Sequence, residues 1–160
     1  DRTSRGLGDV YKRQHHNFGT VEVRVCDMPG NLEDVLAITA LVQSLVKTLS
    51  DMIDNGAYQH DCHPMMVRQN KWRAARFGTH AKLVNSFTYE VESLGLVVNA
   101  LVEKLSPTAE QLGCLNHLER ARAMATAPSW ADKQLAILDK TGDPREVVRQ
   151  LISQSRMSAS

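Results

Sequence analysis

The sequence has few cysteines, few aromatic residues and no long uninterrupted apolar run, and each shortage excludes a class of protein. Its three cysteines, Cys26, Cys62 and Cys114, are odd in number and irregularly spaced, which argues against a disulfide framework and against a CxxC zinc site. The longest apolar stretch, Val35 to Leu49, is interrupted by polar residues and falls short of the roughly 20 apolar residues that a membrane-spanning helix needs. We therefore expect a protein of the reducing cytoplasm that does not cross a membrane.

Neither sign of charge dominates the sequence. Lys and Arg number 19 and Asp and Glu number 18, so the formal net charge is +1. This balance provides no overall field that would attract nucleic acid or an anionic membrane, and we expect neither as a partner. The hydrophobic fraction of 42% and the charged fraction of 23% are ordinary for a folded globular protein, and 160 residues correspond to about one domain.

The beginning of the chain differs in character from the rest. Residues 1–14, DRTSRGLGDVYKRQ, show no periodicity of 2 or 3.6 and contain no apolar core of a secretory signal. The run SRGLGDVYKRQ resembles translated adaptor tails at the ends of reading frames from shotgun assemblies. Two interpretations stay open, a non-native leader and a natural disordered N-terminus. In both cases we expect residues 1–14 to pack against nothing, and we expect residues 155–160 to form a flexible tail.

Strict alternation predicts one clear strand from Thr20 to Cys26, TVEVRVC, whose three valines share one face. Glu22 and Arg24 share the other face, about 6.5 to 7 Å apart, close enough to serve one bound polyanion. A carboxylate suits Mg²⁺, and a guanidinium suits phosphate or carboxylate. The same spacing is also typical of a solvent-exposed strand face with a surface ion pair, and taken alone it favours that interpretation.

Helical periodicity accounts for most of the remaining sequence, and Ala81 to Val91 alternates weakly, which predicts a short hairpin or an irregular loop. Capping and breaking residues predict these helices: Asn31 to about Asn55, Pro64 to Gly78, about Ser93 through Leu105, a separate short helix from Ser106-Pro107 to Gly113, about Leu115 to Ala125, and two opened by capping boxes at Ser129/Asp132 and Asp143/Glu146. The predicted class is α+β. A lone strand needs partners, so we expect residues 15–154 to be the C-terminal portion of a single larger domain.

Three blocks of the sequence resemble one enzyme family. GTVEVRVCDMPGNLEDVLAITALVQSL is similar to the G-T-x-E-x-R-x-x-D-x-P strand and following helix of the glutamate-cysteine ligase type 2, or carboxylate-amine ligase, family. RQNKWRAARFG resembles that family's N-[RK]-[FW]-x-A-x-R-[FY]-G block, and LSPTAEQLG resembles its S/P-x-A-x-x-[LI]-G helix junction. The first block is more distantly similar to the E-x-R-x-x-D-P strand of glutamine synthetase. The blocks occur in order, and the resemblance runs from Phe18 to about Ile152.

The resemblance implies a glutamine-synthetase-like catalytic fold, in which a curved antiparallel sheet lines the active site and helices pack outside it. The implied reaction is the ATP-dependent formation of a γ-glutamyl amide through an acyl phosphate, with Mg²⁺ as cofactor, as in glutathione biosynthesis. The implied partners are small molecules, namely ATP, glutamate and an amino-acid amine such as cysteine. The sequence does not select the amine, and it leaves open whether the protein is a homo-oligomer.

The resemblance also implies roles for individual residues. Glu22 would be a Mg²⁺ ligand, and Arg24 would be a catalytic residue that contacts phosphate or the substrate carboxylate. Asn70, Arg73 and Arg76 match the second block and would bind substrate or nucleotide, although such side chains on a helix are often solvated or form structural caps and ion pairs. The upstream part of the family pattern is absent, so we expect this chain alone to be inactive. The alternative function is that of a non-enzymatic helical interaction domain.

Overall fold

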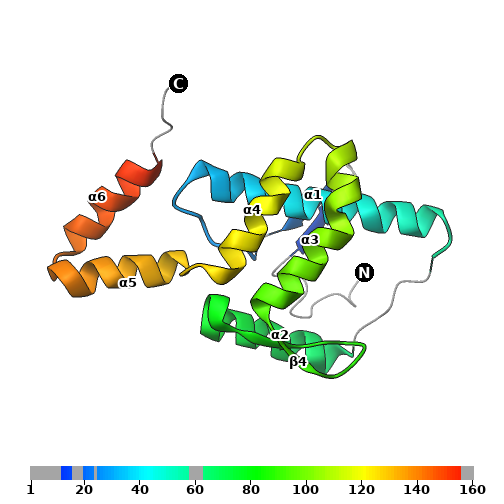
Figure 1. The fold of residues 1–160 in the computed structure, drawn as a ribbon, viewed down its shortest axis with the longest axis horizontal. Coiled ribbons are helices and arrows are strands. Elements are labelled where there is room, and N and C mark those ends of the chain that lie inside the picture. The colour runs from blue at the N-terminus through cyan, green and yellow to red at the C-terminus, as the bar shows by residue number, and fades with distance from the viewer. Residues whose placement is uncertain (1–11, 16–19, 24, 58–62, 156–160) are drawn as a thin grey trace.

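The computed structural model describes residues 12–15, 20–23, 25–57 and 63–155. Two short antiparallel sheets accompany a predominantly helical chain, which confirms the predicted α+β class (Figure 1). The elements are β1 (Lys12–His15), β2 (Thr20–Val23), α1 (Leu32–Asp54), α2 (Pro64–Phe77), the 3₁₀ helix η2 (Gly78–His80), β3 (Lys82–Val84), β4 (Val91–Ser93), α3 (Leu94–Gln111), α4 (Leu115–Thr126), α5 (Trp130–Thr141) and α6 (Pro144–Ser155).

Helices α1, α3 and α4 pack against one another and form the core, whereas α5 and α6 extend to one side of them (Figure 1). Small residues line much of the interface, which lets the helix backbones approach closely. The buried side chains of this cluster are Ala40, Val102, Leu105, Ala109, Leu118 and Ala121. Leu105 and Leu118 are fully buried, and burying one leucine stabilises the fold by about 1.5–3 kcal/mol.

Helix α1 begins as the sequence predicts. The Asn31 side chain accepts a hydrogen bond of 2.7 Å from the backbone N–H of Asp34, which satisfies one of the free donors of the first turn. By length and composition α1 could span a membrane, with a mean hydropathy of 1.3, contrary to the sequence expectation that its apolar stretch is too short. Its buried residues, which include Ala37 and Ala40, face the core, but only 17% of the apolar stretch is buried within the structure.

The prediction of a break at Ser106-Pro107 is wrong, because α3 is continuous through Pro107. Proline within a helix removes one backbone hydrogen bond and costs roughly 3 kcal/mol. Leu105 and Ala109 are both buried in the core, one on each side of the proline, so core packing stabilises the helix on both sides of Pro107. The Ser106 hydroxyl also donates to the carbonyl of Val102 at 2.7 Å.

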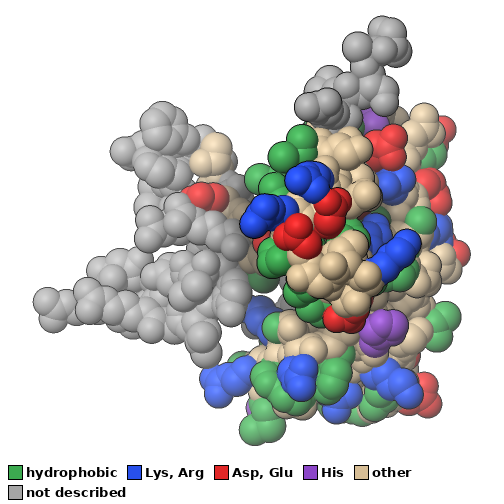
Figure 2. Space-filling model, turned by 90° about the vertical axis from the view of Figure 1, so that its left-hand side faces the viewer, with side chains coloured by type: hydrophobic (Ala, Val, Ile, Leu, Met, Phe, Trp, Pro, Cys, Tyr) green, Lys and Arg blue, Asp and Glu red, His purple; other side chains and the backbone are tan. Residues whose placement is uncertain are grey.

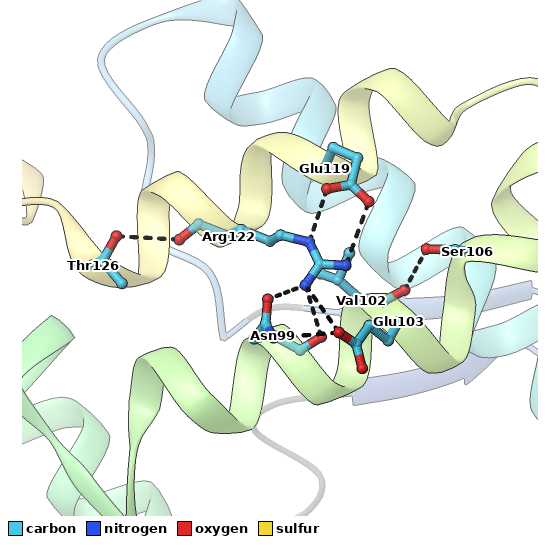
Figure 3. A network of polar contacts seen from close by, with 7 residues as sticks. All are labelled: Asn99, Val102, Glu103, Ser106, Glu119, Arg122 and Thr126. Atoms are coloured by element: carbon cyan, nitrogen blue, oxygen red, sulfur yellow. Dashed lines mark hydrogen bonds and ion pairs between the residues drawn. The ribbon is translucent and has the colours of Figure 1, made fainter.

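A polar network around Arg122 ties α4 to α3 (Figure 3). The Nε of Arg122 donates to Glu119 at 2.8 Å within α4. Its Nη1 donates across the interface to the backbone carbonyl of Asn99 at 3.2 Å and to the Asn99 side-chain oxygen. The guanidinium therefore bridges the two helices at the edge of the apolar core.

Strand β2 is shorter than predicted and has a partner. It ends at Val23, and β1 pairs with it antiparallel, with Lys12 opposite Val23 and His15 opposite Thr20. The expectation that residues 1–14 pack against nothing is therefore wrong for 12–14, because the backbone of these residues pairs with the strand edge. Residues 1–11 lie outside the described part of the chain, so the origin of the leader stays a prediction.

The predicted helix from Pro64 to Gly78 and the hairpin that follows it are confirmed. Helix α2 ends at Phe77 with Gly78 as its C-cap, and the φ of Gly78, 54°, lies in the region that glycine adopts without strain. Strands β3 and β4 then pair antiparallel, with Leu83 opposite Glu92. The hairpin packs against α2 and against the beginning of α3. The helices predicted after Gly113 are also confirmed as α4, α5 and α6.

Candidate functional site

Helix α2 carries basic side chains and no acidic one, and it lies against the β3–β4 hairpin. Figure 2 shows Lys and Arg side chains gathered toward the lower end of the molecule, the end at which Figure 1 places α2 and the hairpin. The basic residues of this helix are Arg68, Lys71, Arg73 and Arg76. Their concentration gives this end of a nearly neutral chain a local positive charge.

Asn70 joins α2 to β3 through both polar atoms of its side-chain amide. Its Nδ2 donates to the carbonyl of Val84 at 2.9 Å, and its Oδ1 accepts from the N–H of Val84 at 2.8 Å. The amide therefore pairs with the strand edge as a neighbouring strand would. In this arrangement Asn70 positions β3, in line with the structural role that the sequence left open.

Arg73 lies beside Asn70 and lines a pocket of about 340 Å³, here called the α2–β3 pocket. Its Nη1 donates to the carbonyl of Lys82 at 3.0 Å, which holds the guanidinium at the junction of helix and strand. The pocket is lined by Gln69, Trp72, Arg73, Phe77, His80 and Lys82. No acidic side chain is among the described residues that line it, so this lining attracts anions.

Two aromatic rings form the apolar part of the α2–β3 pocket. Trp72 and Phe77 meet edge to face, with ring centroids 5.8 Å apart. The guanidinium of Arg76 stacks over Phe77 at 5.8 Å from the ring centroid, so Arg76 supports the ring and does not line the pocket. Both rings are about half exposed. Flat apolar surface next to cationic groups suits a ligand that combines a ring with anionic groups, such as a nucleotide.

The metal ligand that the resemblance implies does not lie on α2 or on the β3–β4 hairpin. Glu22 is on β2 and is exposed, while Arg24 lies outside the described residues. Within the described ranges, no group of three His, Cys, Asp or Glu side chains could hold a metal ion. Mg²⁺ requires about six oxygen ligands. Glu22 can therefore supply one ligand, and the described residues do not complete a magnesium site.

A buried polar network that the sequence did not predict connects α1, α4 and α5. Asp34 is 4% exposed, and its Oδ1 accepts from Arg120 Nε at 2.6 Å while its Oδ2 accepts from Trp130 Nε1 at 2.9 Å. Arg120 also pairs with Glu33 at 3.0 Å. One signal was present in the sequence, since Asp34 stands three residues before the core residue Ala37 and so shares its helix face.

Comparison with known proteins assigns the chain to a family of enzymes. Residues 2–150 match the glutamate-cysteine ligase family 2. A protein of Gloeobacter violaceus named "Putative glutamate--cysteine ligase 2" is 34% identical over 139 residues, which cover 87% of this chain and 37% of the relative. A protein of Clavibacter sepedonicus with the same name is 36% identical over 140 residues, which cover 87% of this chain and 37% of the relative. A protein of Paenarthrobacter aurescens named "Putative glutamate--cysteine ligase 2-2" is 33% identical over 157 residues, which cover 98% of this chain and 40% of the relative.

The matched family supports the class of carboxylate-amine ligases, as the sequence blocks imply. The chain belongs to the glutamate-cysteine ligase family 2. It spans about two fifths of the length of the curated relatives described above.

Proposed function

We propose that the chain forms part of an ATP-dependent ligase that joins the γ-carboxyl of glutamate to an amino-acid amine such as cysteine. The observation that carries this proposal is the family match over residues 2–150. In the proposed reaction ATP phosphorylates the carboxylate, and the amine then displaces phosphate from the acyl phosphate. A cytoplasmic location and a role in glutathione biosynthesis belong to the same proposal.

The α2–β3 pocket is the proposed site for the anionic part of a substrate, such as the phosphates of ATP. Arg73 and Lys82 would bind anionic oxygens, because both cations line a pocket whose described lining contains no acidic side chain. Trp72 and Phe77 would contact the base of a nucleotide. Asn70 would act as a positioning residue, since it holds β3, and thereby Lys82, against the helix.

For Glu22 and Arg24 we propose the roles that the family resemblance implies. Arg24 would contact phosphate or the substrate carboxylate, and Glu22 would be one ligand of Mg²⁺. The remaining metal ligands would come from the part of the ligase that this chain does not span. When bound, the ion would neutralise the phosphate oxygens.

A chimera tests the proposal directly. The residues of the Gloeobacter violaceus relative that match this chain would be replaced by the chain itself, and formation of γ-glutamyl product and phosphate would be measured with ATP, glutamate and cysteine. We expect ligation to depend on all three substrates. A folded chimera without ligation, next to an active parent, would contradict the proposal and favour the interaction domain.

Variants of the chimera test whether the α2–β3 pocket belongs to the active site. Arg73→Gln removes a cation from the pocket and should lower kcat/KM by about 10- to 100-fold. Arg68→Gln is the matched control, because Arg68 is exposed on the same helix and does not line the pocket. Equal activity of the two variants would remove the α2–β3 pocket from the active site.

Two further variants of the chimera test the roles proposed for Glu22 and Arg24. Glu22→Gln should raise the Mg²⁺ concentration that half-maximal turnover requires, because it removes the charge that a hard cation prefers. Arg24→Lys keeps the charge but loses the planar fork, and turnover should fall on the order of 10²- to 10³-fold. Wild-type kinetics in both variants would return Glu22 and Arg24 to a solvent-exposed strand face.

A further inference from the structure

A second pocket has a lining that shares no residue with the proposed α2–β3 site. It has a volume of about 250 Å³ and is formed by α1, η2, α4, α5 and the segment before α5. We call it the Trp130 pocket. Thr79 lines it, whereas the next residue, His80, lines the α2–β3 pocket. A volume below the usual range of about 300–1,000 Å³ for ligand sites suits a small molecule.

The Trp130 ring, which forms one wall of the pocket, is held in place by contacts at its edge and on its face. The indole N–H of Trp130 donates to the buried carboxylate of Asp34, which also accepts from Arg120. Gly30 lies against the indole so closely that a Cβ at this position would be 2.3 Å from a ring carbon. The ring is thus fixed both at its edge and on its face. A fixed wall reduces the entropy that is lost when a ligand binds.

Two polar groups of the pocket form no side-chain hydrogen bond or ion pair with the described residues. The hydroxyl oxygen of Thr79 is buried and has no hydrogen-bond partner among the described residues. The Nζ of Lys133 lies 4.4 Å from the centroid of the Trp130 ring and forms no ion pair within the described ranges. The cation of Arg120, by contrast, already faces Asp34 and Glu33. One ammonium and one hydroxyl therefore remain available to a ligand.

The neighbouring acid of α5 does not neutralise Lys133. The carboxylate of Asp132 accepts hydrogen bonds from the backbone N–H of Ser129 at 2.9 Å and from its hydroxyl at 2.7 Å. These bonds close the capping box and lower the pKa of Asp132, so the acid stays ionised and engaged. Consecutive helix residues also point in different directions, which separates this carboxylate from the Lys133 amine.

We propose that the Trp130 pocket binds a small monocarboxylate of amino-acid size. The Lys133 ammonium and the Thr79 hydroxyl would meet the two carboxylate oxygens, and the apolar side chains of Ala123 and Met124 would contact the aliphatic part. Among the described residues of the pocket, Lys133 is the one cation without an ion pair, and one cation matches a monoanion better than it matches a phosphate dianion. The assignment of this ligand as the acceptor amino acid of the ligation rests on the proposed function, but the binding itself does not.

Fluorine NMR of the 160-residue chain labelled with 5-fluorotryptophan tests the proposal. The chain contains two tryptophans, Trp72 in the α2–β3 pocket and Trp130 in the second pocket, so each pocket has its own resonance. Titration with L-cysteine or L-alanine should shift the Trp130 resonance saturably and leave that of Trp72 in place. Trp130→Phe identifies the resonance. If the chain alone aggregates, the same titration is made in the chimera.

Variants and probe molecules distinguish specific recognition of the carboxylate from a nonspecific shift of the Trp130 resonance. Lys133→Gln should weaken binding at least about 10-fold, while Lys133→Arg should stay within about 3-fold. Lys140→Gln, on the exposed end of the same helix, should change nothing. Thr79→Val should weaken binding about 2- to 10-fold without lowering the melting temperature, because the lost hydroxyl has no described partner in the free protein. A purely structural Thr79 would show the opposite pattern.

Three results would overturn the proposal. The first is a folded chain whose Trp130 resonance does not move at millimolar amino acid. The second is an equal response to L-alaninamide, which lacks the carboxylate. The third is tighter binding of inorganic phosphate than of either amino acid. Binding without ligation in the chimera would instead contradict the proposed function alone.

Discussion

Helices α4 and α5 follow each other in the chain and have the same length, but they are stabilised in different ways. Helix α4 has Cys114 at its N-cap without a side-chain capping bond, and it buries Leu118, Ala121 and Ala125. Helix α5 has a complete capping box at Ser129 and no buried residue among those described. Packing therefore compensates for a poor cap in α4, and capping compensates for sparse packing in α5. Local and tertiary contributions substitute for one another within a single chain.

The largest effect should come from the packed helix. Leu118→Ala leaves a cavity among α1, α3 and α4 and should lower the free energy of unfolding by about 2–5 kcal/mol. Leu135→Ala in α5 is the matched control, because this side chain is 57% exposed and should cost under about 1 kcal/mol. Urea unfolding followed by circular dichroism measures both. Equal losses would mean that α5 is as well packed as α4.

Loss of the Asp34 contacts, which join α1 to α4 and α5, should have the next largest effect on stability. Asp34→Asn removes the charge that faces Arg120 and should lower the free energy of unfolding by about 1–3 kcal/mol. Arg120 is partly exposed, which reduces the cost relative to a fully buried pair. Asp51→Asn, in the exposed pair with Lys47, should cost at most about 0.5 kcal/mol. If both variants lost the same free energy of unfolding, the buried Asp34 carboxylate would contribute no more to stability than a surface charge does.

The capped helix should respond to the loss of its cap. Ser129→Ala should cost about 0.5–2 kcal/mol, mostly as fraying of α5. Hydrogen exchange should therefore accelerate in residues 130–141 while α4 keeps its protection. Ser153→Ala, at an exposed position of α6, serves as the control and should leave both helices unchanged. Faster exchange throughout α4 would show that the two helices unfold as one unit.

The smallest expected effect is the dependence of α5 stability on pH in the acidic range. The hydrogen bonds from Ser129 lower the pKa of Asp132 in the folded state, so this stabilisation is present above the pKa of Asp in the unfolded chain. It is lost as the pH falls through the lowered folded pKa. Ser129→Ala removes the side-chain bond, and its destabilisation relative to the natural chain should shrink in that acidic range. Helicity measured from neutral pH to pH 2 tests this, and a constant difference would contradict it.

The local signals of the sequence were reliable where they concerned helix ends. Asn31, Pro64, Gly78 and Ser129 each mark a boundary that the structure confirms, because caps and breakers act within one turn of the residue itself. The same local reasoning placed a break at Pro107, which is wrong, since the core packs on both sides of that proline. It also left the strand Thr20–Val23 without its partner β1, because pairing depends on a second segment that lacks a periodic pattern.

By itself the sequence determined the α+β class, the family and the helical boundaries other than the one at Pro107, since all three depend on residue types at short, fixed spacings. Only the tertiary structure decided which polar residues meet. Asp34 reaches Trp130 across 96 positions, and Thr79 comes to line one pocket with Lys133. No periodicity encodes these contacts, because they arise where separate helices cross. The physical reason is that capping and propensity act within a turn, whereas burial and charge pairing depend on how the helices pack in space.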